Sequence, residues 1–332
     1  RQTSNNDLTV NFGQDDTFQT GSAAGETTAG NTDENGIGKF QYEPPAGFLA
    51  LCSSNLPNLT ISPNQGTQAT DHFNTVLYTG NGYPTSDGQT ISGVGFQPDW
   101  VWLKSRSLSH NHSLYDSPRG ATKELSSNVT TAEATEATFL TAFNGDGFVL
   151  GAGNEVNQQN GTFVGWNWKA GGDITDVSGN FIKDGVAFTP TQGTIDATAI
   201  SVNTTSGFSI VTYTGTGSAG TIAHGIGSTP SMVIIKNRTG ASVPNWVIGQ
   251  DQSGFTGQMY FDTGVFSSNS GSFNNTAPTS SVVTINTDST VNQNTATYVM
   301  YCFANVEGYS KIGQYNGNSS SDGTFVYLGF RP

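Results

Sequence analysis

The sequence has few charged residues, few basic residues in particular, and no long apolar run. Charged side chains make up 11% of the 332 residues, and the 12 Lys and Arg are scattered singly among 25 Asp and Glu. A phosphate-binding surface needs clustered basic side chains, so this distribution argues against a nucleic-acid partner. Neither a run of 18 apolar residues nor an apolar amino-terminal region occurs, so no membrane insertion is expected and no intact signal peptide is visible.

Cysteine is also scarce. Cys52 and Cys302 lie far apart in the chain, each within an apolar run, and no CxxC-type metal spacing occurs. A disulfide scaffold of a secreted protein would carry more cysteines, so we expect two buried thiols. Stability should therefore come from side-chain packing and strand pairing. We expect no cofactor.

Residues that favour helices are rare, whereas residues that favour turns and strands are abundant. The chain has 42 Gly and 11% aromatic residues, with many Thr, Ser and Asn. Gly and Asn tolerate the backbone angles of tight turns, and Thr and aromatic residues suit a half-buried pleated surface. This composition predicts an all-β fold with many turns. Only residues 130–140, "TTAEATEATFL", could form a helix, and β-branched Thr residues interrupt that run.

The chain repeats itself. "FNTVLYTGNG" at 73–82 returns as "FSIVTYTGTG" at 208–217, and "GFQPDWVWLKSR" at 95–106 returns as "GSTPSMVIIKNR" at 227–238. Each copy closes on a further related segment, "GTFVGWNWKAGG" and "ATYVMYCFANVEG". The chain therefore contains two copies of one domain body.

Alternation within the repeated segments predicts strands that are covered on both faces. In "DWVWLK", Trp100 and Trp102 fall on one face and Val101 and Leu103 on the other, and the "SMVIIK" segment of the second copy alternates in the same way. Such strands belong in the interior of a sandwich. Lys104 and Lys236 are expected where the strands emerge. "FLTAFNGDGFVLG" and "SVVTINTDSTVNQ" are each predicted as a hairpin.

These patterns predict tandem antiparallel β-sandwich domains, with incomplete domains at both ends of the chain. The sandwiches cover 71–172 and 207–307, with a linker over 173–206 between them. Residues 308–332 repeat the opening strands of a third copy, because "YSKIGQYNGN" and "GFRP" align with the corresponding segments of the first two. Residues 1–57 match no copy and are predicted as the end of another domain or an assembly segment, with an apolar strand in "FLALCSSNL".

Segments from both the amino-terminal part and the repeats resemble those of a known protein family. "DENGIGKFQYEPPAGFLALCSSNLP" looks like the carboxyl end of the SPRY-like (concanavalin-like) domains of large structural proteins of marine tailed bacteriophages. "VGFQPDWVWLKSRS" and "TYVMYCFANVEGYSKIGQYNGN" are similar to the β-rich repeats that follow that domain in the same proteins. The resemblance implies a virion or tail-fibre-like component and transfers no catalytic residue.

No titratable residues converge in a recognisable catalytic motif, so we do not expect an enzyme. His110 and His112 form an H-x-H pair and are weak candidates for a metal site, although such a pair in a Ser/Asn-rich loop is more often solvated. Tyr83 and Trp246 lie in turn-like segments and are weak candidates for stacking on a sugar, although packing is the more common role. Eight Asn-x-Ser/Thr triplets permit glycosylation without being evidence of it. They begin at Asn58, Asn111, Asn128, Asn160, Asn203, Asn237, Asn274 and Asn318.

Taken together, the sequence predicts a structural subunit of an extracellular fibre, of bacteriophage tail-fibre or virion type, that associates with copies of itself. One alternative is a cellular extracellular filament whose subunits exchange strands, with residues 1–20 or 309–332 as the donated segment. Another is a lectin-like module that binds a cell-surface glycan or receptor.

Overall fold

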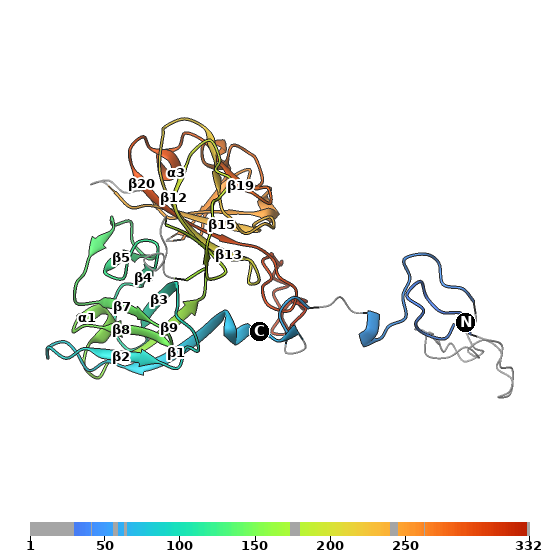
Figure 1. Ribbon diagram of the computed structural model, residues 1–332, viewed down its shortest axis with the longest axis horizontal. Helices are drawn as coiled ribbons and strands as arrows, with labels where there is room; N and C mark the ends of the chain where they lie inside the picture. Colours follow the sequence, from blue (N-terminus) through green and yellow to red (C-terminus); the bar gives the residue numbers. More distant parts are fainter. Residues whose placement is uncertain are drawn as a thin grey trace. The chain divides into compact units, whose positions relative to one another are not determined.

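The computed structural model describes residues 30–40, 42–55, 59–62, 65–172, 180–239, 245–261 and 263–330. The chain divides into two compact units, residues 1–59 and 60–332. The fold is all-β, as predicted, and its strands form several sheets (Figure 1). None of the helices in the described part of the chain has the length and apolar character needed to span a bilayer.

In the first unit, the described residues are organised around the carboxylate of Asp33. Its oxygens accept hydrogen bonds from the backbone N–H groups of Asn35, Ile37 and Ala50. A short 3₁₀ helix, η1, spans Ser53–Asn55. The strand predicted in "FLALCSSNL" was wrong, because its described residues form bends and this 3₁₀ turn. The SPRY-like identity of 1–57 stays a prediction.

The first repeat has nine strands. They are β1 Phe73–Thr79, β2 Gln89–Ser92, β3 Trp100–Ser105, β4 Ser113–Asp116, β5 Lys123–Ser126, β6 Ala134–Thr135, β7 Leu140–Asn144, β8 Gly147–Leu150 and β9 Thr162–Trp168. Two short helices, η3 Ala69–Asp71 and α1 Asn154–Asn157, complete it. The strands form a six-stranded sheet in the order β1-β9-β3-β4-β5-β6, here called sheet A, and a three-stranded sheet, β2-β8-β7, here called sheet B.

The described residues of the second repeat form eleven strands. They are β10 Phe181–Lys183, β11 Val186–Ala187, β12 Ala197–Asn203, β13 Phe208–Thr214, β14 Gly220–Ala223, β15 Met232–Asn237, β16 Val247–Gln250, β17 Gln258–Tyr260, β18 Phe266–Ser267, β19 Val282–Ile285 and β20 Thr297–Phe303. Its short helices are η5 Asp251–Ser253, α2 Ser270–Phe273 and α3 Ser289–Asn292. Nine strands form sheet C, in the order β11-β10-β12-β13-β20-β15-β16-β17-β18, and β14 and β19 form sheet D.

Each repeat is a sandwich of one large and one small sheet. In the first, Val101 and Leu103 of sheet A pack with Phe148 of sheet B. In the second, Val233 of sheet C packs with Ile222 and Val283 of sheet D. These cores contain the faces that the alternation of the central strands predicts to be apolar.

The outer faces of the two large sheets pack on each other, so the second unit is a stack of four sheets. Trp100 of β3 lies at the centre of this third core, with its ring 4.5 Å from that of Tyr301 and 5.8 Å from that of Phe208. Figure 1 shows the two repeats side by side. Because large buried aromatic surfaces dominate packing energy, the two sandwiches form one body rather than two independent domains.

Matching hydrogen bonds occur at equivalent positions of the two repeats. The hydroxyl of Tyr78 donates to the carbonyl of Val156, and that of Tyr213 donates to Val291; both bonds span 78 residues. These bonds tie the opening strand of each repeat, β1 or β13, to the short helix before its closing strand. The equivalent helices, α1 and α3, were not predicted from the sequence.

The predicted linker over 173–206 was wrong for its described part. Residues 180–206 form β10, β11 and β12, and β12 pairs along β13. This strand extends sheet C on a side where sheet A has no equivalent strand. A strongly apolar, β-branched segment such as "ATAISVN" is more stable in a sheet than in a solvated linker.

Four local predictions had different outcomes. The Asn144–Gly147 hairpin of β7 and β8 is confirmed. The second predicted hairpin was wrong, because its first strand, β19, is followed by α3. Residues 130–140, the one stretch that could have formed a helix, contain β6, a turn and the first residue of β7. Lys236 does not emerge at the surface, because it is fully buried with its Nζ 5.7 Å from the ring centre of Trp246.

The segment predicted as the start of a third repeat forms no strand in its described residues, 308–330. Its one backbone pairing is a bridge between Val306 and Ser310. Beyond it, the rings of Tyr315, Phe325 and Tyr327 are exposed. The opening strand of a repeat pairs with its closing strand, and the described chain contains no closing strand for this segment.

Trp100→Ala should destabilise both repeats together, by about 3–5 kcal/mol, because it leaves a large cavity in the shared core. All five Trp lie in the second unit, and Trp246 reports on the second repeat. Urea unfolding followed by Trp fluorescence should give one transition at lower urea. Trp100→Phe is the matched control: it keeps a ring and removes an indole N–H that has no hydrogen-bond partner among the described residues, so it should lose far less. Separate transitions for the two repeats would contradict a shared core.

Candidate functional site

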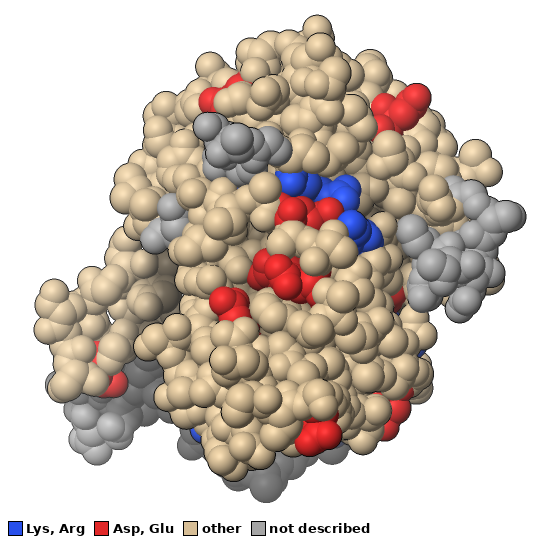
Figure 2. Space-filling view, turned by 90° about the vertical axis from the view of Figure 1, so that its left-hand side faces the viewer, with Lys and Arg blue, Asp and Glu red and all other residues tan. Residues whose placement is uncertain are grey.

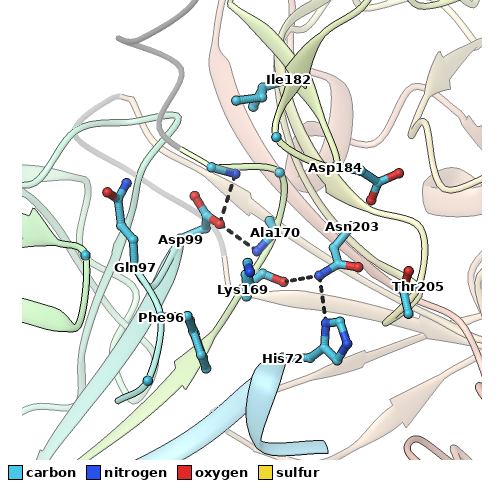
Figure 3. Close-up of a pocket in the computed structure, with 15 residues that line it drawn as sticks. His72, Phe96, Gln97, Asp99, Lys169, Ala170, Ile182, Asp184, Asn203 and Thr205 are labelled. Atoms are coloured by element: carbon cyan, nitrogen blue, oxygen red, sulfur yellow. Dashed lines mark hydrogen bonds between the residues drawn. The ribbon is translucent and has the colours of Figure 1, made fainter. Parts of the chain in front are cut away.

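A cavity of the second unit lies where the two repeats meet. It has a volume of about 760 Å³ (Figure 3). Its walls come from residues before β3, after β9 and around β10 and β12, so both repeats contribute. The side chains labelled in Figure 3 are His72, Phe96, Gln97, Asp99, Lys169, Ala170, Ile182, Asp184, Asn203 and Thr205.

Asp99 fixes the wall on the first-repeat side. It lies directly before β3, and its buried carboxylate accepts hydrogen bonds from the backbone N–H groups of Ala170 at 2.7 Å and Gly172 at 3.2 Å. The hydroxyl of Ser117 donates to its other oxygen at 2.8 Å. A buried carboxylate is stable only when its oxygens are satisfied in this way. Asp99 therefore positions the chain as it leaves β9.

A hydrogen bond between His72 and Asn203 joins the repeats at this cavity. The amide nitrogen of Asn203 lies 3.0 Å from Nδ1 of His72, and Nε2 of the same ring lies 2.9 Å from the hydroxyl of Thr67. Burial lowers the pKa of His72, and the nearby charge of Lys169 lowers it further. With Asn203 donating to Nδ1, the neutral ring carries its proton on Nε2.

The cavity offers polar groups rather than a catalytic arrangement. Lys169 and Asp184 are exposed at it, and Asp184 also accepts two hydrogen bonds from Thr204. The described lining contains no Ser or Cys beside a base, and its one aromatic ring, that of Phe96, is buried. Its polar and charged lining suits a polar ligand better than an apolar one.

A buried ionic cluster provides a second link between the repeats. Asp116 accepts from Nε of Arg119 and from the hydroxyl of Tyr301, both at 2.5 Å. Glu133 then accepts from Arg119 at 3.1 Å and from Nε of Arg238 at 2.8 Å. Since Tyr301 and Arg238 belong to the second repeat, this cluster ties it to the first. The pair of Asp116 and Arg119 is itself fully buried.

Charge is otherwise sparse on the surface. In Figure 2 most of the visible face carries neutral side chains, and acidic and basic groups adjoin near its middle. Within the described residues, no group of three or more His, Cys, Asp or Glu is placed to hold a metal ion.

The predicted metal candidates, His110 and His112, have different partners. His110 directs Nε2 to the side chain of Gln158, at 2.9 Å. The backbone N–H of His112 donates to Asn128, and burial and the charge of Lys104 lower the pKa of its ring. Each ring therefore has a separate local environment.

The two residues predicted as candidates for stacking on a sugar differ in exposure. Tyr83 is 53% exposed and stays available for binding. The prediction that Trp246 stacks on a sugar was wrong, because the residue is 1% exposed and its indole N–H donates to the carbonyl of Ser126 across the repeats.

The Asn residues of the predicted glycosylation triplets also differ in exposure. Asn203 and Asn237 are buried and hydrogen-bonded, so the prediction that they could be glycosylated is wrong for the folded protein. Asn58 lies outside the described residues. Asn111 is half-buried, and the exposed positions are Asn128, Asn160, Asn274 and Asn318.

The polar residues that build this cavity had no individual signal in the sequence. Asp99, His72 and Asn203 each look like ordinary turn or strand-end residues. The second repeat has Ser231 where the first has Asp99, so comparing the copies would have marked Asp99 as a difference.

A family model covers both repeats and the segment after them. It matches residues 68–332. The chain belongs to the family described as a domain of unknown function (DUF7483). No curated protein and no solved structure matches the chain. The family boundary agrees with the second unit, since one model includes both sandwiches.

His224 should make stability depend on pH. The ring is buried, with Nε2 3.2 Å from the carbonyl of Thr279 and Nδ1 accepting from the N–H of Ile226, and burial lowers its pKa to about 4. Below pH 6.5 the unfolded chain binds a proton that the folded chain does not, so the free energy of unfolding should fall by about 3 kcal/mol between pH 6.5 and pH 4.

Urea unfolding at several pH values measures this slope, and His224→Gln should reduce it. His72 and His112 have lowered pKa values as well and contribute in the same direction, so part of the slope should remain. An unchanged slope in His224→Gln would contradict the assignment.

Proposed function

We propose that this chain is a structural subunit of an extracellular fibre, of bacteriophage tail-fibre or virion type, and that it acts by self-assembly and surface display. The observation that carries the proposal is the shared aromatic core around Trp100, which makes two sandwiches into one body. Domains joined by small polar interfaces move relative to each other by default. A fibre subunit has to hold its direction, and a large apolar interface removes that freedom.

The remaining features support the same proposal. The buried cluster of Arg119, Glu133 and Arg238 is a further link that needs a defined geometry between the repeats. The surface is acidic and sparsely charged, which favours solubility without attracting nucleic acid. The resemblance to repeats of phage structural proteins agrees with this reading, and a cellular filament that polymerises by strand exchange would use the same architecture.

Self-association is the direct test. Multi-angle light scattering of the purified chain over a range of concentrations should give a mass above that of one chain that rises with concentration. Electron microscopy of the same samples should show elongated particles. One chain per particle at every concentration would contradict the proposal.

A lectin-like role is the second candidate, favoured by the exposed ring of Tyr83. Its loop also carries Asn81 and Asp87, which are exposed polar neighbours of the kind that bind sugar hydroxyls. If this loop binds a glycan, Tyr83→Ala should reduce glycan-array signal by about tenfold, the loss expected for one stacked ring. Tyr42→Ala, at an equally exposed ring in the first unit, is the matched control. A wild-type array without signal would rule out this candidate.

A further inference from the structure

The opening strands of the two repeats differ in how they are covered. β13 lies between β12 and β20, and six of its seven residues are buried. Among the described strands, the equivalent strand, β1, pairs only with β9, and one of its seven residues is buried. One edge of β1 is therefore the free edge of sheet A.

Tyr78 and Tyr213 make matching hydrogen bonds and therefore hold equivalent positions in β1 and β13. Starting from this pair, the two strands can be aligned residue by residue. On this alignment Leu77 corresponds to Thr212, which is 4% exposed and pairs with Ala199 of β12. Leu77 itself is 66% exposed. The difference reflects the missing strand, since the two residues hold the same place in their sheets.

The described residues before β1 do not supply that strand. Ser62 pairs with Thr67 in an isolated bridge, and η3 follows directly. At the edge itself, the N–H of Thr75 donates to the side chain of Asn74. The carbonyl of Thr79 accepts a hydrogen bond from the side-chain amide of Gln89. These local bonds satisfy backbone groups without a neighbouring strand.

Nothing in the sequence of β1 blocks the edge. "FNTVLYT" contains no charged residue and no Pro, the two devices that most often keep an edge strand from pairing. An uncharged edge of seven residues with an exposed Leu is a template for another strand.

The segment Thr324–Phe330 has the properties of a partner strand. Its sequence, "TFVYLGF", is uncharged and has the same length as β12. Phe325 is 86% exposed and Tyr327 72% exposed, and the segment makes no backbone–backbone hydrogen bond with another described residue. Its N–H and C=O groups are therefore available for a ladder.

Within its own chain this segment is directed elsewhere. The hydroxyl of Thr324 donates to the carbonyl of Asn316, and a Cβ added at Gly329 would lie 3.2 Å from the carboxylate of Glu307. The segment thus folds back on the residues that precede it, and its own β1 edge stays uncovered.

We propose that Thr324–Phe330 of a second copy adds to the free edge of β1, as β12 adds to β13. This inference rests on the proposed self-assembly and identifies its contact. Because the donor segment and the acceptor edge are different surfaces, each copy can receive one strand and give another. Contacts of this head-to-tail kind build open chains rather than closed dimers.

Two variants test the contact from its two sides. Leu77→Lys places a charge on the acceptor edge, and Val326→Pro removes a ladder N–H from the donor segment. Each should weaken association at least about tenfold. Both positions are at least partly exposed, so the wild-type urea midpoint should be kept. Val265→Lys and Ser321→Pro are matched controls at exposed positions away from the contact and should associate as wild type does.

Mixing the variants gives the decisive result, read by mass photometry. Leu77→Lys keeps a functional donor and Val326→Pro keeps a functional acceptor, so each alone should be monomeric and the mixture should form pairs and nothing longer. Either variant assembling as wild type, or a mixture that stays monomeric, overturns this contact. Assembly that persists in both variants leaves the proposed fibre function standing, whereas a wild type that never associates removes both.

Discussion

The structure depends on one constraint: the central strands of both repeats are apolar on both faces, so each large sheet needs a cover on each side. In β3, Val101 and Leu103 are covered by the small sheet of the same repeat, while Trp100 faces the other repeat. In β15, Val233 is likewise covered by the small sheet of its own repeat, while Ile234 faces the other repeat. A single sandwich would leave the outer face of its large sheet in water, at a cost of roughly 25 cal/mol for every Å² of apolar surface. Packing the repeats back to back satisfies both sheets at once.

The polar groups at this junction add specificity to that apolar packing. Burying the charges of Arg119, Asp116 and Glu133 is costly unless each has partners, and here each has them. The links from Tyr301 to Asp116 and from Arg238 to Glu133 form only in one arrangement of the repeats. The hydrogen bond between His72 and Asn203 adds a third such requirement at the pocket. Apolar surfaces alone would tolerate sliding, whereas these groups allow one register.

Duplication has left the repeats alike in their cores and different at their edges. The matching bonds of Tyr78 and Tyr213 show how closely the body is kept. The strand β12, in contrast, belongs to the second repeat alone and covers an edge that the first repeat leaves open. An edge strand gains or loses a neighbour without disturbing the core, which is why the difference between the copies lies there.

The sequence by itself determined the class of fold, the duplication and the faces of the central strands. These follow from period-two alternation and turn residues, which are local properties that each segment carries alone. Tertiary structure decided what covers each face, because that depends on residues far apart in the chain. Trp246 gained a contact across the repeats, residues 180–206 proved to contain strands, and His72 and Asn203 gained their link only when the two sandwiches met. A strand's pattern records that a face must be buried, and the identity of the covering surface is settled only by the packing of the whole chain.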